Sequence, residues 1–554
     1  MPAAAHYEVP KNSVAAAATL LLFTMLVALL DGPIWLVKLV PTQDGPVHLA
    51  QADLIARFGW GGALQEPAAS FYQWNPRLEP NSAIYFVLAG LIRLSGDALM
   101  ANTLFLNLYG LLWIAAAFAV CRGETQHPAL PMLLLLPLAF GVFIHWGFYN
   151  YALGVPLFLL FASFWRKAGE RRNVVTFLTT ALFLAALCLT HITAVVAACL
   201  LLAADGLARA VRTLDQSGIR TAMRQLCIDG AWAAGAAIPV LLITASFLMA
   251  YQNIPGEAAG SEGGLLQILR RIMAATYLFS FTRWEIVGLA PLLAALLIAG
   301  AAALRRIRSG DLIWPVFLAL VVVLSLLDLK TGAASLSERL APFTWIAVVM
   351  AIASRQPGAA LVRTLCLAAL AGLIGQTAIR SAAYKNWSAT LDSELDAGRA
   401  NPGETFVNAD LIPQRSSALF TWRVRPTLHA AQTAALAAHG AGLSSPLPST
   451  RYFGYFPLQY IQAHDFMRAA PDWESEPDAA SLANFRKVNR GAPHILIVSS
   501  SDDSGAALAR RLGYGDCRVS DGAPQLAICR VAARQSVVHL WERNSSPIPD
   551  AVAN

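Results

Sequence analysis

Charged residues are scarce in this 554-residue chain. They make up 14% of it, whereas a soluble domain has roughly 25%. Hydrophobic residues make up 56%, against about 45 to 50% in soluble proteins. This balance excludes an ordinary soluble enzyme and predicts an integral membrane protein.

Several common motifs are also missing. The seven cysteines show no CxxC spacing or His/Cys cluster, which argues against a structural zinc site or a redox motif. No Walker loop, GxSxG, HExxH or dinucleotide fingerprint occurs in a suitable context, which argues against ATP hydrolysis and serine hydrolase chemistry. Cys517 and Cys529 are the one candidate disulfide pair, provided that the tail lies in an oxidising compartment.

The net charge of +7 comes mostly from arginines in short clusters beside apolar runs. Because no broad basic face results, nucleic acid is excluded as a partner, and the clusters instead indicate cytoplasmic loops and contacts with anionic lipid. Three clusters are strongest: Arg166, Lys167, Arg171 and Arg172; Arg209, Arg212, Arg220 and Arg224; and Arg305, Arg306 and Arg308.

Apolar segments of membrane-spanning length recur before residue 380. They lie near residues 14–36, 82–95, 98–120, 129–145, 149–165, 173–190, 192–208, 231–250, 286–304, 311–329, 339–354 and 360–379.

Charge parity orients these segments. The first segment reads as an uncleaved signal anchor with its N-terminus inside. The stretch Val174–Ala204 is too long for one span, so we predict two spans with an outward tip at His191. An even number of crossings before residue 166 requires that one segment does not cross. Segment 82–95 is short and carries Arg93, so we predict about 11 spans, or 12 if it crosses.

The chain divides into a membrane domain, residues 1–380, with an outward first loop at 40–81, and a soluble domain, residues 381–554. In the second part, residues 494–498 are predicted as a buried strand, residues 525–531 and 537–541 as edge strands and residues 506–512 as a helix. We therefore predict a polytopic α-helical membrane protein with a C-terminal, outward-facing α/β domain.

The predicted topology brings polar groups from distant segments to the outer face. One-sided convergence of an acid, imidazoles and guanidinium groups beside apolar helices is typical of a membrane-interface active site. The candidates are Asp44, His48, Arg77, His145, Asn150, His191, Glu338 and Arg339.

Asp44 is the candidate base, and two alternatives stay open for it. It precedes Gly45-Pro46, which suits the start of an amphipathic interfacial helix with Val47, Ala50, Leu54 and Phe58 on its apolar face. Asp44 would then be an N-cap and nothing more. Alternatively, His48 one turn later shares a proton or a divalent metal ion with it, although two ligands do not make a metal site.

The other candidates carry structural alternatives. Arg339 suits a phosphate held by paired hydrogen bonds, or an interfacial arginine paired with Glu338. The aromatic turn from His145 to Asn150 suits stacking on a sugar, or anchoring in the membrane's aromatic belt. His191 suits either a substrate contact or a packed, hydrogen-bonded histidine.

This layout resembles the GT-C superfamily of membrane glycosyltransferases, of the family 39 type. The resemblance rests on one span, an outward loop with an acid (Asp44) leading into a helix, many further spans and an outward soluble domain. It implies a bacterial inner-membrane enzyme that moves a sugar from a polyprenyl-phosphate carrier to a glycan, lipid or protein acceptor, with Asp44 as the loop acid. Many members have paired acids here, whereas Gly45 follows Asp44 in this chain.

Two other classes of function fit the same residues. A transporter or flippase of a lipid-linked or polar solute would use the outer groups as a binding cavity, although we find no internal repeat of the kind that transporters show. A non-catalytic envelope protein would use them to bind a glycan. Sugar transfer separates the first class from both alternatives.

Overall fold

The computed structural model describes residues 13–66, 68–70, 72–75, 79–168, 171, 173–251, 278–279, 281–282, 284–304, 312–326, 330–331, 334–355, 358–402, 406–410, 430–438, 458–460, 494–499, 502–511, 514–519 and 525–531.

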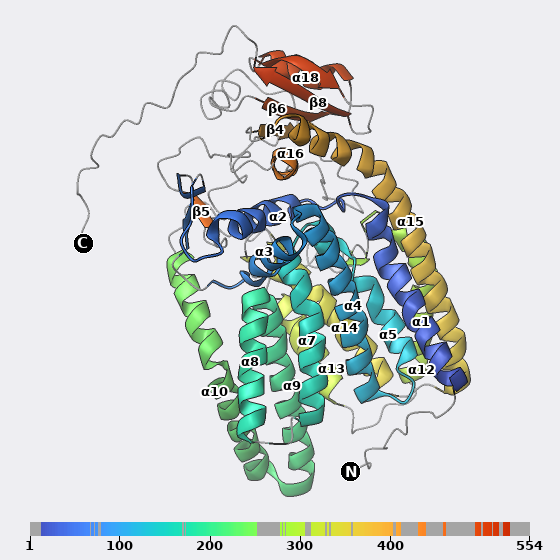
Figure 1. The fold of residues 1–554 in the computed structure, drawn as a ribbon. Helices are drawn as coiled ribbons and strands as arrows, with labels where there is room; N and C mark the ends of the chain where they lie inside the picture. Colours follow the sequence, from blue (N-terminus) through green and yellow to red (C-terminus); the bar gives the residue numbers. More distant parts are fainter. Residues whose placement is uncertain are drawn as a thin grey trace, which may run out of the picture.

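The described part of the chain is dominated by a bundle of apolar helices (Figure 1). Five of them are long and apolar enough to cross a membrane: α4 (Ala98–Glu124), α9 (Ile192–Ser217), α10 (Ile219–Tyr251), α12 (Glu285–Leu304) and α15 (Ala359–Ala400). Around them lie α1 (Ser13–Asp31), α3 (Ala83–Ser95), α7 (Tyr149–Ala168), α8 (Val174–Thr190), α13 (Ile313–Leu326) and α14 (Leu336–Ala353). The chain is an integral membrane protein, and the count of about 11 spans stays a prediction.

The long apolar stretch from residue 174 forms two helices, as predicted. α8 ends and α9 begins at His191, whose extended backbone (φ −165°) interrupts the helix. The predicted segment 129–145 is not one continuous helix, because it is broken into α5 (Ala129–Leu135), η4 (Leu136–Leu138) and α6 (Val142–His145). Its crossing of the membrane stays a prediction. Pro137 has no backbone N–H to donate within a continuous helix. Gly141 lies so close to the Leu278 carbonyl that a Cβ on Gly141 would be 1.9 Å from the carbonyl oxygen.

Both ends of α3 lie at the same end of the bundle. Its start contacts Asn150, the second residue of α7, since the Asn150 side chain accepts from Ile84 N. α4 follows α3 immediately and runs in the direction of α7: Asn102 near its start bonds Tyr149, and Glu124 at its end pairs with Arg166. This is the placement that a non-crossing segment 82–95 requires.

α12 and α15 pack in close backbone contact. A Cβ on Gly288 of α12 would lie 2.6 Å from the Gly375 carbonyl carbon of α15. The same pair of helices shares a buried ion pair, in which Arg380 Nη2 lies 3.1 Å from Glu285 Oε2. α15 continues to Ala400 and carries the chain out of the bundle toward the sheet (Figure 1), so the predicted domain boundary at residue 380 falls inside one helix.

The C-terminal part contains a four-stranded sheet of order β4-β6-β8-β7. β4 (Phe406–Asp410) is parallel to β6 (His494–Ser499), while β8 (Gln525–Val531) is antiparallel to β6 and to β7 (Tyr514–Val519). α18 (Asp502–Arg511) packs on this sheet. The predicted strands at 494–498 and 525–531 are confirmed, as is a helix in this stretch. The prediction that 525–531 is an edge strand is wrong, because β8 pairs with β6 on one side and with β7 on the other. The strand predicted at 537–541 lies outside the described residues.

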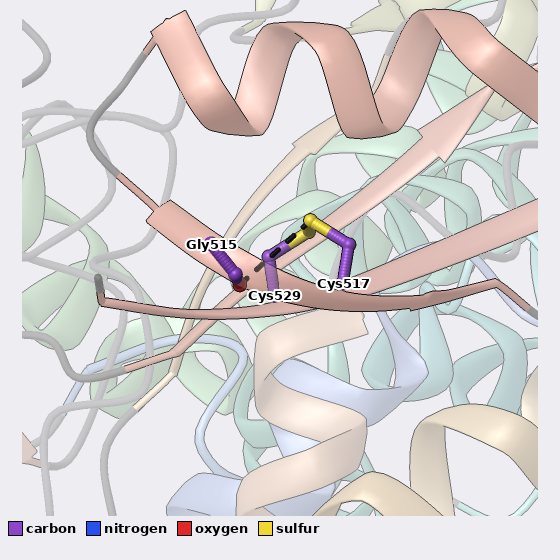
Figure 2. Close-up of a disulfide and its surroundings, with 3 residues drawn as sticks. All are labelled: Gly515, Cys517 and Cys529. Atoms are coloured by element: carbon purple, nitrogen blue, oxygen red, sulfur yellow. Dashed lines mark hydrogen bonds between the residues drawn. A yellow bond between two sulfur atoms is a disulfide. The ribbon is translucent and has the colours of Figure 1, made fainter. Parts of the chain in front are cut away.

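Cys517 and Cys529 form a disulfide between β7 and β8, which settles the pairing left open by the sequence (Figure 2). The two cysteines face each other across neighbouring antiparallel strands, with Cα atoms 4.0 Å apart. The bond therefore joins the last two described strands of the sheet.

α2 (Gly45–Leu54) crosses the end of the bundle, beneath the C-terminal part (Figure 1). It packs on α3 and α4 on one side and on α16 (Ala430–Ala438) on the other. Because both sides are covered, residues all around α2 are buried, including Leu49 and Ala52. The predicted amphipathic interfacial helix is therefore wrong in its exposed face. β1 (Tyr72–Trp74) pairs with β5 (Leu458–Tyr460) and ties the first loop to the C-terminal part a second time.

Candidate functional site

The loop before α2 is held by the aromatic turn before α7. Gln43 N donates to the His145 carbonyl at 2.7 Å, and Asp44 N donates to the Trp146 carbonyl at 3.0 Å. These two bonds join segments about a hundred positions apart in the sequence. They fix the position of the Asp44 backbone at the end of the bundle.

Two glycines make this close contact possible. Gly147 has φ +81°, and a Cβ there would lie 2.3 Å from Gly45 N and 2.7 Å from Asp44 N. A Cβ on Gly45 would lie 2.0 Å from Thr42 Oγ1 and 2.6 Å from the Tyr149 hydroxyl. The position after Asp44 thus has no room for the second acid found in many GT-C enzymes, because two hydroxyl groups occupy that space.

Asp44 stands at the N-cap position of α2, yet its side chain makes no capping hydrogen bond. The interpretation of Asp44 as a simple N-cap is therefore wrong. Its half-buried carboxylate instead accepts from Gln43 Nε2 at 3.4 Å and lies within electrostatic range of the Tyr85 hydroxyl.

His48 lies one turn after Asp44 and contacts Tyr85. Its Nδ1 is 2.8 Å from the Tyr85 hydroxyl, and its ring lies 6.0 Å from that of Tyr149. Tyr149 in turn donates to Asn102 Oδ1 at 3.2 Å. Asp44, His48 and Tyr85 together form what we call the acid cluster.

Asn150 and His145 serve the framework around this cluster. The Asn150 amide accepts from Ile84 N at 2.9 Å and donates to the Asn81 carbonyl. These bonds hold the start of α3, which carries Tyr85, against α7. His145 is fully buried, with Nδ1 donating to the Gly141 carbonyl at 2.8 Å and Nε2 accepting from the Tyr384 hydroxyl at 2.7 Å. These polar atoms are engaged inside the fold, and the substrate contact predicted for the two side chains stays a prediction.

Arg339 and His191 lie together beside the same turn. The Tyr151 hydroxyl donates to the Arg339 carbonyl at 2.6 Å, and the Tyr151 ring packs edge-on against His191 at 5.1 Å. The Arg339 guanidinium lies 5.9 Å from the centre of the Phe148 ring. Since the Phe148 turn also binds the Asp44 backbone, the aromatic turn connects Arg339 with the acid cluster.

His191 has a defined neutral form. Its Nδ1 accepts from Thr193 N at 3.1 Å and caps α9. The proton of the neutral ring therefore belongs on Nε2, which makes that atom a donor. The packed, hydrogen-bonded histidine is thus observed, and it leaves a donor atom in the neighbourhood of Arg339.

The remaining candidates are less informative. Arg77 lies outside the described residues. Glu338 is half-buried in the first turn of α14, where a negative charge is favoured by the helix dipole. Among the residues that the structure describes, no three His, Cys, Asp or Glu side chains converge as a metal site would require.

Comparison with known proteins identifies the fold. Neither protein-family models nor curated proteins gave a match. Among solved structures, the chain is similar to the crystal structure of ArnT from Cupriavidus metallidurans in the apo state, with a TM-score of 0.55 and 12% sequence identity over 94% of this chain and 99% of that one. The chain has the GT-C fold. At this identity, the similarity concerns the arrangement of the chain and not its substrates.

Within this GT-C fold, the sequence alone identified some groups of the site and missed others. Tyr85, Tyr149 and Tyr151 were missed because a tyrosine in an apolar helix looks like a packing residue. Tyr149 belongs to the aromatic turn that had been singled out and Tyr151 follows it directly, and that was the available signal. For Tyr85 the sequence offers no signal, since its contact with His48 spans 37 positions.

Proposed function

We propose that this protein is a membrane glycosyltransferase that moves a sugar from a polyprenyl-phosphate carrier to an envelope glycan, lipid or protein acceptor. The observation that carries the proposal is the placement of Asp44. Its side chain does not cap α2, while its backbone is clamped by the aromatic turn that also contacts Arg339. An acid and a cation held by one turn suit a transfer reaction, in which the acid acts on the acceptor hydroxyl and the cation on the departing phosphate.

In the proposed reaction, Asp44 takes the proton of the acceptor hydroxyl as the new glycosidic bond forms. Arg339 binds the carrier phosphate through paired N–H groups and stabilises the negative charge that it gains on departure. His191 Nε2–H adds a second donor on that side. Glu338 completes the proposed substrate-binding group.

We further propose that the site and the C-terminal part face outward from a bacterial inner membrane. The arginine clusters support this orientation through the positive-inside rule. The Cys517–Cys529 disulfide supports it independently, since disulfides persist in oxidising compartments such as the periplasm. The carrier sugar would thus be used on the outer face.

The test is sugar transfer by purified protein in proteoliposomes, using undecaprenyl phosphates that carry radiolabelled hexoses or pentoses and an envelope extract as acceptor. Asp44→Asn should lower the rate by roughly 10² to 10⁴, the usual contribution of a general base. The matched control is Asp97→Asn: Asp97 caps α4 through its side chain at the same end of the bundle, and asparagine keeps that cap. Equal rates for Asp44→Asn and the unmodified protein would overturn the proposal, and carrier flux without transfer would indicate a flippase.

A further inference from the structure

We propose that Tyr384 of α15 is a positioning residue, which holds the Asp44 loop in its reactive place by fixing His145. This inference rests on the proposed function and deepens it by naming a residue that acts through the acid rather than on substrate. Tyr384 lies 239 positions after His145 in the sequence, and their contact joins α15 to the aromatic turn.

The contact between Tyr384 and His145 is a hydrogen bond with a defined direction. His145 Nδ1 lies 2.8 Å from the Gly141 carbonyl, which can only accept, so this nitrogen carries the ring proton. Nε2 of the neutral ring is then an acceptor, and the Tyr384 hydroxyl donates to it at 2.7 Å. Both side chains are fully buried, so loss of one partner leaves the other unsatisfied.

A second route from the same helix supports the His145 ring. Phe281 stacks on the ring, with centres 4.6 Å apart and planes 21° apart. The Phe281 backbone is held by Glu285, whose Oε1 accepts from Phe281 N at 2.8 Å. Glu285 forms the buried ion pair with Arg380, one turn before Tyr384 on α15. The ring is therefore held at its edge by Tyr384 and on its face by Phe281, and both supports lead back to α15.

The backbone of His145 carries this position to the acid. Its carbonyl accepts from Gln43 N at 2.7 Å, and the next carbonyl, that of Trp146, accepts from Asp44 N at 3.0 Å. In a close-packed interior, a ring that shifts toward a new partner moves its own backbone as well. The Asp44 side chain makes no capping bond to α2, so the backbone bonds of its loop set its place.

Loss of the Tyr384 hydroxyl should therefore slow the transfer step and leave carrier binding intact. Misplacement of a catalytic group by about 1 Å can cost 10²-fold, and we expect Tyr384→Phe to lower kcat roughly tenfold, because the Phe281 support remains. KM for the carrier should stay the same, since the proposed phosphate ligand Arg339 is bonded through its carbonyl to Tyr151. A fall in kcat at constant KM marks an interaction that matters only in the transition state.

The experiment measures kcat and KM of the full-length protein in proteoliposomes with the same labelled carriers, at a temperature below the unfolding range of every variant. His145→Asn is the second variant, because its amide still donates to the Gly141 carbonyl but offers no acceptor in place of Nε2. Both variants lose the same bond, so the double variant His145→Asn/Tyr384→Phe should be no slower than the slower single one.

The decisive comparison is made in Asp44→Asn protein, whose residual transfer is followed by long incubation with the label. In this background, neither Tyr384→Phe nor His145→Asn should cause a further loss, because both act through the missing carboxylate. His145→Asn gives this answer independently if Tyr384→Phe does not fold.

The control is Thr377→Val, which removes another hydroxyl of α15. That hydroxyl donates to the Leu29 carbonyl of α1 at 3.0 Å, and its removal should leave kcat unchanged. An unmodified kcat in Tyr384→Phe would overturn the inference, as would a loss that multiplies with that of Asp44→Asn, which a general effect on the fold would produce. If Asp44→Asn is slow while Tyr384→Phe keeps the full rate, the positioning role alone fails. If Asp44→Asn is fully active, the proposed function fails and this inference with it.

Discussion

Asp44 owes its position to its backbone hydrogen bond with Trp146 and to two glycines that leave room for this contact. Gly147 adopts a positive φ and packs directly on the Asp44 backbone, and Gly45 makes space for two hydroxyl groups. Residues with a Cβ rarely adopt the backbone conformation of Gly147, and a Cβ at that position would meet main-chain atoms that cannot rotate away.

We therefore expect Gly147→Ala to impair transfer more than its small size suggests. The new Cβ must displace the backbone at Asp44 and Gly45, and misplacement of a catalytic group by about 1 Å can cost 10²-fold in rate. Gly61→Ala is the matched control, because nothing lies within 4 Å of that position. Transfer rates of the two variants check this expectation, and equal rates would show that the turn does not position the acid.

The helices differ in how much of their arrangement the sequence reveals. Hydrophobic length located α4, α8, α9 and α12 well, because a run of apolar residues has few other places to go. It did not reveal the helix breaks within residues 129–145 or the burial of α2, since both depend on which other segment lies alongside. α12 and α15 illustrate the same point, because their contact is made by glycines that are unremarkable in the sequence.

Gly288→Ala should lower the unfolding temperature of the protein in detergent. A methyl group at this position would meet the Gly375 backbone of α15, and overpacking of this kind costs about 1 to 3 kcal/mol. Gly230→Ala in α10 makes the same substitution with no atom within 4 Å. It should be neutral or slightly stabilising, since alanine favours a helix by about 1 kcal/mol over glycine. Similar losses in both variants would contradict the close packing of α12 and α15.

The first loop and α2 are in contact with the C-terminal part of the chain. α16 covers α2, and β1 pairs with β5, so the acid cluster lies in a layer between the bundle and the C-terminal part. The composition change after residue 380 predicted a different environment for the C-terminal part. It could not show that α15 runs through the boundary or that the C-terminal part covers the first loop.

The disulfide provides a test of orientation for the whole molecule. In a variant that retains Cys517 and Cys529 as its only cysteines, the pair should resist maleimide labelling in intact cells and become reactive after reduction. Reactivity without a reductant would place this part in a reducing compartment. In purified protein, Cys517→Ser/Cys529→Ser should destabilise the C-terminal part, because the unfolded chain is no longer constrained by the bond. The expected loss is roughly 3 kcal/mol for a closed loop of this size, with a separation of 12 residues. Circular dichroism during denaturant unfolding measures this difference.

The sequence by itself determined the environment of this protein, its main helices, the strands at residues 494–499 and 525–531 and the suspicion that fell on Asp44. These features follow from local hydrophobicity, charge and alternation, which a single segment carries in full. Only the tertiary structure decided that Asp44 does not cap α2 with its side chain, that Asn150 and His145 bond inside the fold, and that Tyr85 contacts His48. Those outcomes depend on which distant backbone fills the space beside each side chain, and no single segment contains that information.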